Sequence, residues 1–166
     1  MIKGTVLKYN QENINTDLII PARYLNNSDP YHLAKHCMED LDLKFHIKRE
    51  KLGSNILVGG INFGNGSSRE QAPIAIKYSG IDIVIASSFA RIFYRNSINI
   101  GLSLIEFEEI NRLNTGDDLN IDLKNGLLIN NTKKESHKIS KIPQFLQDIV
   151  DTGGLVNYAR KLILEK

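Results

Sequence analysis

The residues best suited to chemistry lie in one glycine-rich stretch, residues 59–70, with the sequence GGINFGNGSSRE. Two serine hydroxyls and a guanidinium follow four glycines, between an expected strand and an expected helix. Glycines let a ligand approach the backbone closely, and the free N–H groups at a helix start attract anions. Arg69 can hold a carboxylate through two parallel hydrogen bonds, which a lysine cannot reproduce. The stretch therefore predicts an anion site.

A second interpretation of the same residues is that they only start a helix. The spacing Ser67-x-x-Glu70 is that of a capping box, and Ser68-x-x-Gln71 is a second candidate. Familiar nucleotide-binding loops are excluded by spacing, because Arg69 stands where the dinucleotide fingerprint needs its third glycine, and no Gly-Lys-Ser/Thr ending exists. The anion site and the simple cap both stay open at this point.

Residues that bind metals are scarce, with one cysteine and four histidines in the chain. The single Cys37 excludes a disulfide framework and a cysteine-ligated cluster or zinc site built from this chain alone. His32 and His36 have a spacing that can chelate zinc, but Leu33 stands where the zinc-hydrolase motif needs glutamate. A solvated helix face is favoured, and no metal site is predicted.

Composition indicates an ordinary globular protein with one domain spanning residues 1–166. Its 21 basic and 19 acidic residues give a formal charge of +2, which predicts neither a nucleic-acid stripe nor an acidic tail. The sequence shows no secretory signal and no run of about 20 apolar residues that could span a membrane. We therefore expect a cytoplasmic protein that binds neither nucleic acid nor membrane.

Arginine is used sparingly, at seven of the 21 basic positions. Arg91 and Arg95 lie four residues apart on an expected helix. They form either one exposed or salt-bridged face or ligand contacts, and the sequence favours neither.

Strands and helices are expected to alternate through the chain. We expect strands over 2–9, 55–58, 81–86 and 102–107, helices over 31–40, 70–78, 89–96, 143–150 and 155–164, and a hairpin within 118–129 turning at Asn125-Gly126. Residues 10–30 form a long irregular segment, of a kind that is often functional. This succession predicts an α/β fold with a mixed, partly parallel sheet and packed helices.

Three ordered motifs resemble one known family. Residues 15–25 (NTDLIIPARYL), 60–73 (GINFGNGSSREQAP) and 88–93 (SFARIF) are similar to the small subunits of 3-isopropylmalate dehydratases, the swivelling domain of the aconitase superfamily. The resemblance extends over nearly the whole chain. It implies a swivelling β/β/α fold and a hydro-lyase reaction. That reaction moves a hydroxyl between neighbouring carbons of isopropylmalate by dehydration and rehydration, in leucine biosynthesis.

The same resemblance implies an active site divided between two chains. A [4Fe-4S] cluster would be bound by a large subunit, and this chain would bind no cofactor. By position in the motif, Ser67 would be the catalytic base that takes a proton from carbon, while Ser68 and Arg69 would hold a carboxylate of the small dicarboxylate substrate. A serine is a poor base unless its alkoxide is stabilised, so backbone N–H groups and positive charge are expected beside it.

Substrate choice in this family is implied to depend on the loop after residues 24–25. Homoaconitase small subunits place an arginine there, whereas this chain has the uncharged Asn26 and Asn27, which favours the isopropyl substrate. Homoaconitase-type and dimethylmalate-type hydro-lyases, and a non-catalytic carboxylate-binding module of the same fold, are the alternatives. The chain departs from the family at Asn65, where cysteine is usual, and at Gln71, where many members have histidine.

Overall fold

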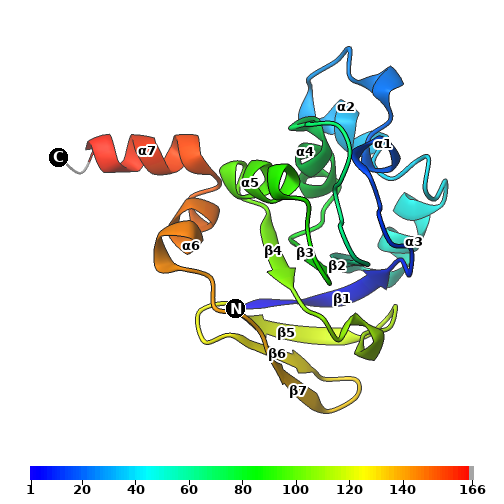
Figure 1. The fold of residues 1–166 in the computed structure, drawn as a ribbon, viewed down its shortest axis with the longest axis vertical. Helices are drawn as coiled ribbons and strands as arrows, with labels where there is room; N and C mark the ends of the chain where they lie inside the picture. Colours follow the sequence, from blue (N-terminus) through cyan, green and yellow to red (C-terminus); the bar gives the residue numbers. More distant parts are fainter. Residues whose placement is uncertain (165–166) are drawn as a thin grey trace.

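A seven-stranded mixed sheet forms the centre of the computed structural model, which describes residues 1–164. The strand order is β4-β3-β2-β1-β5-β6-β7 (Figure 1). The strands are β1 (Ile2–Lys8), β2 (Ser54–Gly59), β3 (Ile83–Ala86), β4 (Ser103–Glu106), β5 (Asp118–Asp122), β6 (Leu127–Asn130) and β7 (Glu135–Lys138). Strands β1 to β4 pair in parallel, and β5 to β7 continue the sheet antiparallel. The predicted mixed, partly parallel sheet is confirmed.

Helices pack beside the parallel half of this sheet, and the last helix projects away from the body (Figure 1). The helices are α1 (Thr16–Ile19), α2 (Pro30–Lys35), α3 (Phe45–Leu52), α4 (Gln71–Tyr78), α5 (Arg91–Asn99), α6 (Gln144–Asp151) and α7 (Leu155–Leu164), with 3-10 turns η1 (Ala22–Tyr24) and η2 (Ile110–Arg112). Within residues 1–164, no helix combines the length and apolar character needed to cross a membrane.

The parallel strands are buried on both faces, so two separate cores form. In β3, Val84 and Ala86 join the core on the helix side, whereas Ile83 and Ile85 join the core enclosed by the antiparallel strands. All four residues of β3 are buried. This explains why the strand has a continuous apolar sequence and does not alternate with polar residues.

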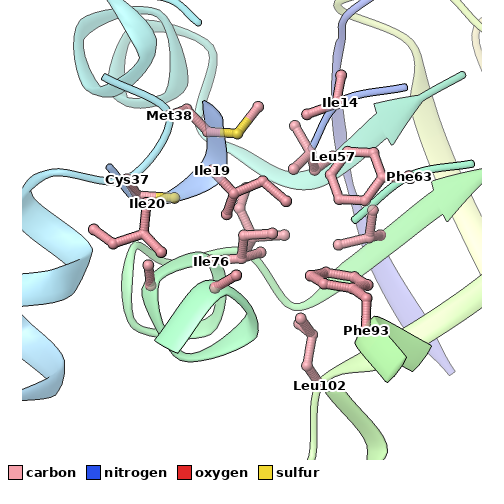
Figure 2. Close-up of a cluster of buried hydrophobic side chains, with 14 of the residues drawn as sticks. Ile14, Ile19, Ile20, Cys37, Met38, Leu57, Phe63, Ile76, Phe93 and Leu102 are labelled. Carbon is pink, nitrogen blue, oxygen red and sulfur yellow. The ribbon is translucent and has the colours of Figure 1, made fainter. Parts of the chain in front are cut away.

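The helix-side core ties three distant segments together (Figure 2). Ile19 and Ile20 pack in it with Ile76 of α4, and the rings of Phe63 and Phe93 meet edge-on with centroids 5.4 Å apart. Burying each such side chain contributes about 1.5–3 kcal/mol. The core therefore holds α1, the glycine-rich stretch and α5 in one arrangement.

Some elements differ from the sequence expectation. The helix expected over 31–40 begins with the predicted cap, since the Asp29 side chain accepts the His32 N–H at 2.9 Å, but it ends at Lys35. The chain then turns back, with Met38 at φ 62° and its N–H donated to the carbonyl of Ile19. Helix α3, strand β7 and the short helix α1 inside the supposedly irregular segment were not predicted.

A glycine at position 64 is required by close packing, which gives a stability prediction. Gly64 has φ 78°, and a Cβ there would meet the Phe93 side chain at 2.1 Å. Overpacking and backbone strain together predict that Gly64→Ala lowers the free energy of unfolding by about 3 kcal/mol in urea denaturation. Gly116→Ala is the matched control, since Gly116 has φ 92° with nothing within 4 Å of a Cβ, and should lose only about 1 kcal/mol. Equal losses in both variants would contradict the packing argument.

Candidate active site

The three sequence motifs converge on the glycine-rich stretch. Residues 63–65 pair through their backbone with residues 14–16 on one side and with residues 88–90 on the other. The Gly64 N–H donates to the carbonyl of Ile14 at 2.8 Å, and the Phe63 carbonyl accepts the Ala90 N–H at 2.9 Å. The stretch is therefore held like a short central strand between two flanking segments.

The interpretation of the two serines as helix caps is wrong. Helix α4 begins only at Gln71, and its capping residue Glu70 makes no side-chain cap hydrogen bond. Ser67 and Ser68 lie in an exposed loop before the helix. The Ser67 carbonyl instead accepts the hydroxyl of the buried Thr16 at 3.0 Å, so a tertiary contact replaces the local capping pattern.

Ser67 and Arg69 line one cavity of about 320 Å³ at the surface. The opposite wall comes from residues 90–93 and Asn96, at the start of α5. The other predicted site residues, Ser68, Asn26 and Asn27, are exposed and do not line this cavity. The structure thus brings together two of the five predicted site residues.

The loop after η1 has its own local structure. There the Asn27 side chain accepts the Asp29 N–H at 2.9 Å. Neither Asn26 nor Asn27 lines the cavity of Ser67, so their role in the choice of substrate stays a prediction.

Arg69 is held by one of its nitrogens only. Its side chain is 13% exposed, and Nη1 donates both to Asp17 Oδ1 at 2.6 Å and to the Ile20 carbonyl at 3.0 Å. Within residues 1–164 the Nε and Nη2 edge has no acceptor, so it is available to a carboxylate. Sequence reasoning missed Asp17 as the residue that positions Arg69. The only signal for it was an acidic residue within the first motif.

Unpaired backbone donors lie next to Ser67 in the chain. Across the described part of the chain, the N–H groups of Gly66, Ser67 and Ser68 have no acceptor. Helix α5 also begins at this cavity, and its capping residue Ala90 offers no side chain to the first N–H groups. With the Arg69 guanidinium alongside, these donors favour a bound anion and a negative charge on Ser67.

The departure at Asn65 leaves the loop intact. The Asn65 Nδ2 donates to the Asn62 carbonyl at 2.9 Å, and Asn62 itself has φ 57°. The other departure, Gln71, is the first residue of α4. Neither side chain lines the cavity that contains Ser67.

The thiol and imidazoles of this chain do not form a cluster site. Among residues 1–164, no three side chains of the His, Cys, Asp and Glu types gather to hold a metal. Cys37 is buried, and this burial raises the pKa of its thiol to about 12. His36 stacks on Tyr24 and lies 2.7 Å from Glu39. A single protonated thiol does not fit an iron–sulfur cluster, which needs several thiolate ligands.

A polar network anchors the loop that carries Asn26 and Asn27. Tyr24 at its start donates its hydroxyl to Glu39 at 2.7 Å, and Arg23 pairs with Glu39 and with Asp40. The hydrogen bond from Tyr24, then that from His36, hold the pKa of Glu39 at about 2. The network therefore ties the start of the loop to the chain segment after α2.

Comparisons with known proteins place this geometry in a family. Residues 41–110 match the aconitase C-terminal domain family. The small subunit of 3-isopropylmalate dehydratase from Nautilia profundicola is 52% identical over 165 residues, which cover 99% of this chain and 98% of that protein. The corresponding subunit from Caldicellulosiruptor bescii is 54% identical over 161 residues, 96% of this chain and 95% of that protein. The chain belongs to the family of 3-isopropylmalate dehydratase small subunits.

The fold agrees with a solved member of this small-subunit family. The crystal structure of 3-isopropylmalate dehydratase from Methanocaldococcus jannaschii has a TM-score of 0.89 and 47% identity, covering 98% of this chain and 95% of that chain. The resemblance and the α/β fold inferred from the sequence are confirmed. The roles of individual residues are not decided by these similarities.

Stability at acid pH tests the network around Tyr24. Because the pKa of Glu39 is depressed from 4.5 to about 2, its contribution is complete above pH 4.5 and is lost as the pH falls towards 2. Tyr24→Phe removes the hydrogen bond that lowers the pKa of Glu39 most. As the pH falls from 4.5 to 2, the free energy of unfolding measured in urea should therefore fall less in this variant than in the parent chain. Tyr31→Phe, at a ring that is 72% exposed, is the control and should leave the profile unchanged. An identical profile in Tyr24→Phe would contradict the assignment.

Proposed function

We propose that this chain supplies half of the active site of a cytoplasmic 3-isopropylmalate dehydratase. The enzyme interconverts 2-isopropylmalate and 3-isopropylmalate in leucine biosynthesis, and a large subunit completes the site. One observation carries this proposal. Ser67 and Arg69 line the same surface cavity, at the point where the three motifs of the family meet. A cavity with unpaired donors on an exposed face suits a site that a partner closes.

Ser67 is the base in this proposal. Its hydroxyl makes no hydrogen bond within residues 1–164, so its lone pairs are free to face a substrate carbon. The open N–H groups of residues 66–68 and the Arg69 guanidinium stabilise the alkoxide that a serine base requires. Ser67 Oγ takes the proton from carbon as the substrate hydroxyl leaves, and returns it when water adds to the neighbouring carbon.

Arg69 binds the carboxylate next to the reacting carbon. The contacts of Nη1 with Asp17 and the Ile20 carbonyl fix the guanidinium and, within residues 1–164, leave its Nε and Nη2 edge without an acceptor. Two parallel hydrogen bonds from that edge match a carboxylate. They also stabilise the negative charge that spreads onto the carboxylate as the carbon loses its proton. Ser68, beside Arg69 in the chain, is proposed to donate to the same carboxylate once the partner has closed the site.

The partner subunit is proposed to hold the [4Fe-4S] cluster, since the single buried Cys37 does not fit one. When bound, such a cluster acts as a Lewis acid toward the substrate hydroxyl and carboxylate. The task of this chain is to present Ser67 and Arg69 and to exclude water as the two subunits close.

Asn26 and Asn27 are proposed to face the alkyl substituent of the substrate in the closed complex. They carry no charge and so offer nothing to pair with the additional carboxylate of a homoaconitase substrate. Their loop is exposed in the isolated chain, so the arrangement depends on closure against the partner. A dimethylmalate-type substrate remains the alternative that this pair of side chains also suits.

Replacing the base tests the mechanism directly. In a complex reconstituted with a cluster-bearing large subunit, Ser67→Ala should lower kcat by about 10³-fold, because a positioned base contributes roughly 10²–10⁴. Binding of the large subunit should not change. Ser136→Ala, at an exposed serine of β7, is the matched control and should retain full turnover. An unchanged rate in Ser67→Ala would eliminate the base assignment and leave a non-catalytic carboxylate-binding module.

Arg69 can be tested by a substitution that keeps its charge. Arg69→Lys retains a cation but loses the two-point hydrogen bond, so KM for isopropylmalate should rise about tenfold and kcat should also fall. Steady-state kinetics of the reconstituted complex measure both constants. Arg112→Lys, whose guanidinium pairs with Glu109 and Glu135 outside the cavity, provides the comparison and should change neither. A KM that is unaltered in Arg69→Lys would show that Arg69 does not bind the substrate.

A further inference from the structure

A second cavity, of about 380 Å³, lies next to the cavity of Ser67, and Arg91 lines both. We call it the α5 cavity. Its walls include the rings of Phe89 and Tyr94 and the apolar residues Ile142 and Pro143. Arg95 and Lys141 also line it. The cavity thus combines an aromatic and apolar surface with three cations.

These cations are not neutralised by the chain itself. Arg91, Arg95 and Lys141 are exposed and form no ion pair within residues 1–164. Glu106 lines the same cavity but pairs with none of them. By contrast, four other arginines have carboxylate partners, namely Arg23, Arg49, Arg69 and Arg112. Arg91 and Arg95 therefore lie on the exposed face that the sequence allowed, without the ion pairs of a salt-bridged one, and contact with a ligand or partner stays open.

A partner that covers the cavity of Ser67 is expected to cover the α5 cavity as well, because the two cavities are adjacent. A stable interface buries about 800 Å² on each side, far more than the mouth of one small cavity. Ile92, in the wall of the cavity of Ser67, is an apolar residue that is 50% exposed. A subunit that covers Ser67 and Ile92 meets Arg91, and through Arg91 it reaches the α5 cavity.

We propose that the α5 cavity receives an acidic segment of the large subunit. Carboxylates of that segment pair with Arg91, Arg95 and Lys141, and an apolar or aromatic side chain packs against Phe89 and Tyr94. Arginine beside aromatic rings in a desolvated pocket is the composition of interface hot spots, and complementary charge also speeds association. This inference rests on the proposed function, because it requires a large subunit that closes over Ser67.

Charge reversal at two positions outside the catalytic cavity tests the docking surface. The double variant Arg95→Glu/Lys141→Glu should bind the large subunit at least 100-fold more weakly in calorimetric titration. At saturating concentrations its kcat should stay within about twofold of the parent chain. The control variant Lys51→Glu/Lys124→Glu makes the same change in net charge at exposed lysines of α3 and of the hairpin turn, and should bind normally.

The remaining outcomes separate this inference from its alternatives. Parent-like affinity in the double variant, or an equal loss in the control, would overturn the proposal. Calorimetry with isopropylmalate and the isolated chain tests whether the α5 cavity is instead a site for a small anion. If the double variant loses isopropylmalate binding but still assembles normally with the large subunit, the proposal is also overturned. If the double variant melts below the parent chain, Arg95→Ala replaces it, and affinity must still fall at least tenfold. A parent chain that assembles with no large subunit would instead refute the proposed function.

Discussion

The structure depends on the backbone pairing that clamps residues 63–65 between residues 14–16 and residues 88–90. This pairing uses the hydrogen-bonding groups at the centre of the glycine-rich loop, whereas the N–H groups of residues 66–68 have no acceptor within residues 1–164. Gly64 makes the clamp possible, because any side chain there would overlap Phe93. The position of Ser67, the orientation of Arg69 and the start of α5 all follow from this one arrangement.

The clamp also explains why the site is incomplete in a single chain. Residues 66–68 of the loop are exposed, so water has access to Ser67. A serine base and a carboxylate-binding arginine work best where water is excluded. In the proposed complex, the cations around α5 and the exposed Ile92 provide a surface against which a partner excludes it. The proposed catalytic cavity and the proposed docking surface share Arg91, which lines both cavities.

Elements with a clear apolar pattern were predicted from the sequence, whereas sparsely buried elements and contacts between distant segments were missed. The parallel strands were predicted because their apolar runs report burial on both faces, as in β3. Helix α3 was missed because only Phe45 in it is buried, and β7 because its side chains are half-buried or exposed. The capping boxes did not form because α4 begins only at Gln71, and the contact of Thr16 with the Ser67 carbonyl is one that no local pattern reveals. The ion pair of Asp17 with Arg69 has the same origin.

The central claim is that this chain is one half of an active site, and titration tests it most directly. Increasing amounts of the chain are added to a fixed amount of a cluster-bearing 3-isopropylmalate dehydratase large subunit, and isomerisation of 2-isopropylmalate is followed. The account predicts no turnover by either chain alone and a rate that rises with added chain to a plateau. Turnover by this chain alone, or a large subunit that reaches the full rate without it, would contradict the account.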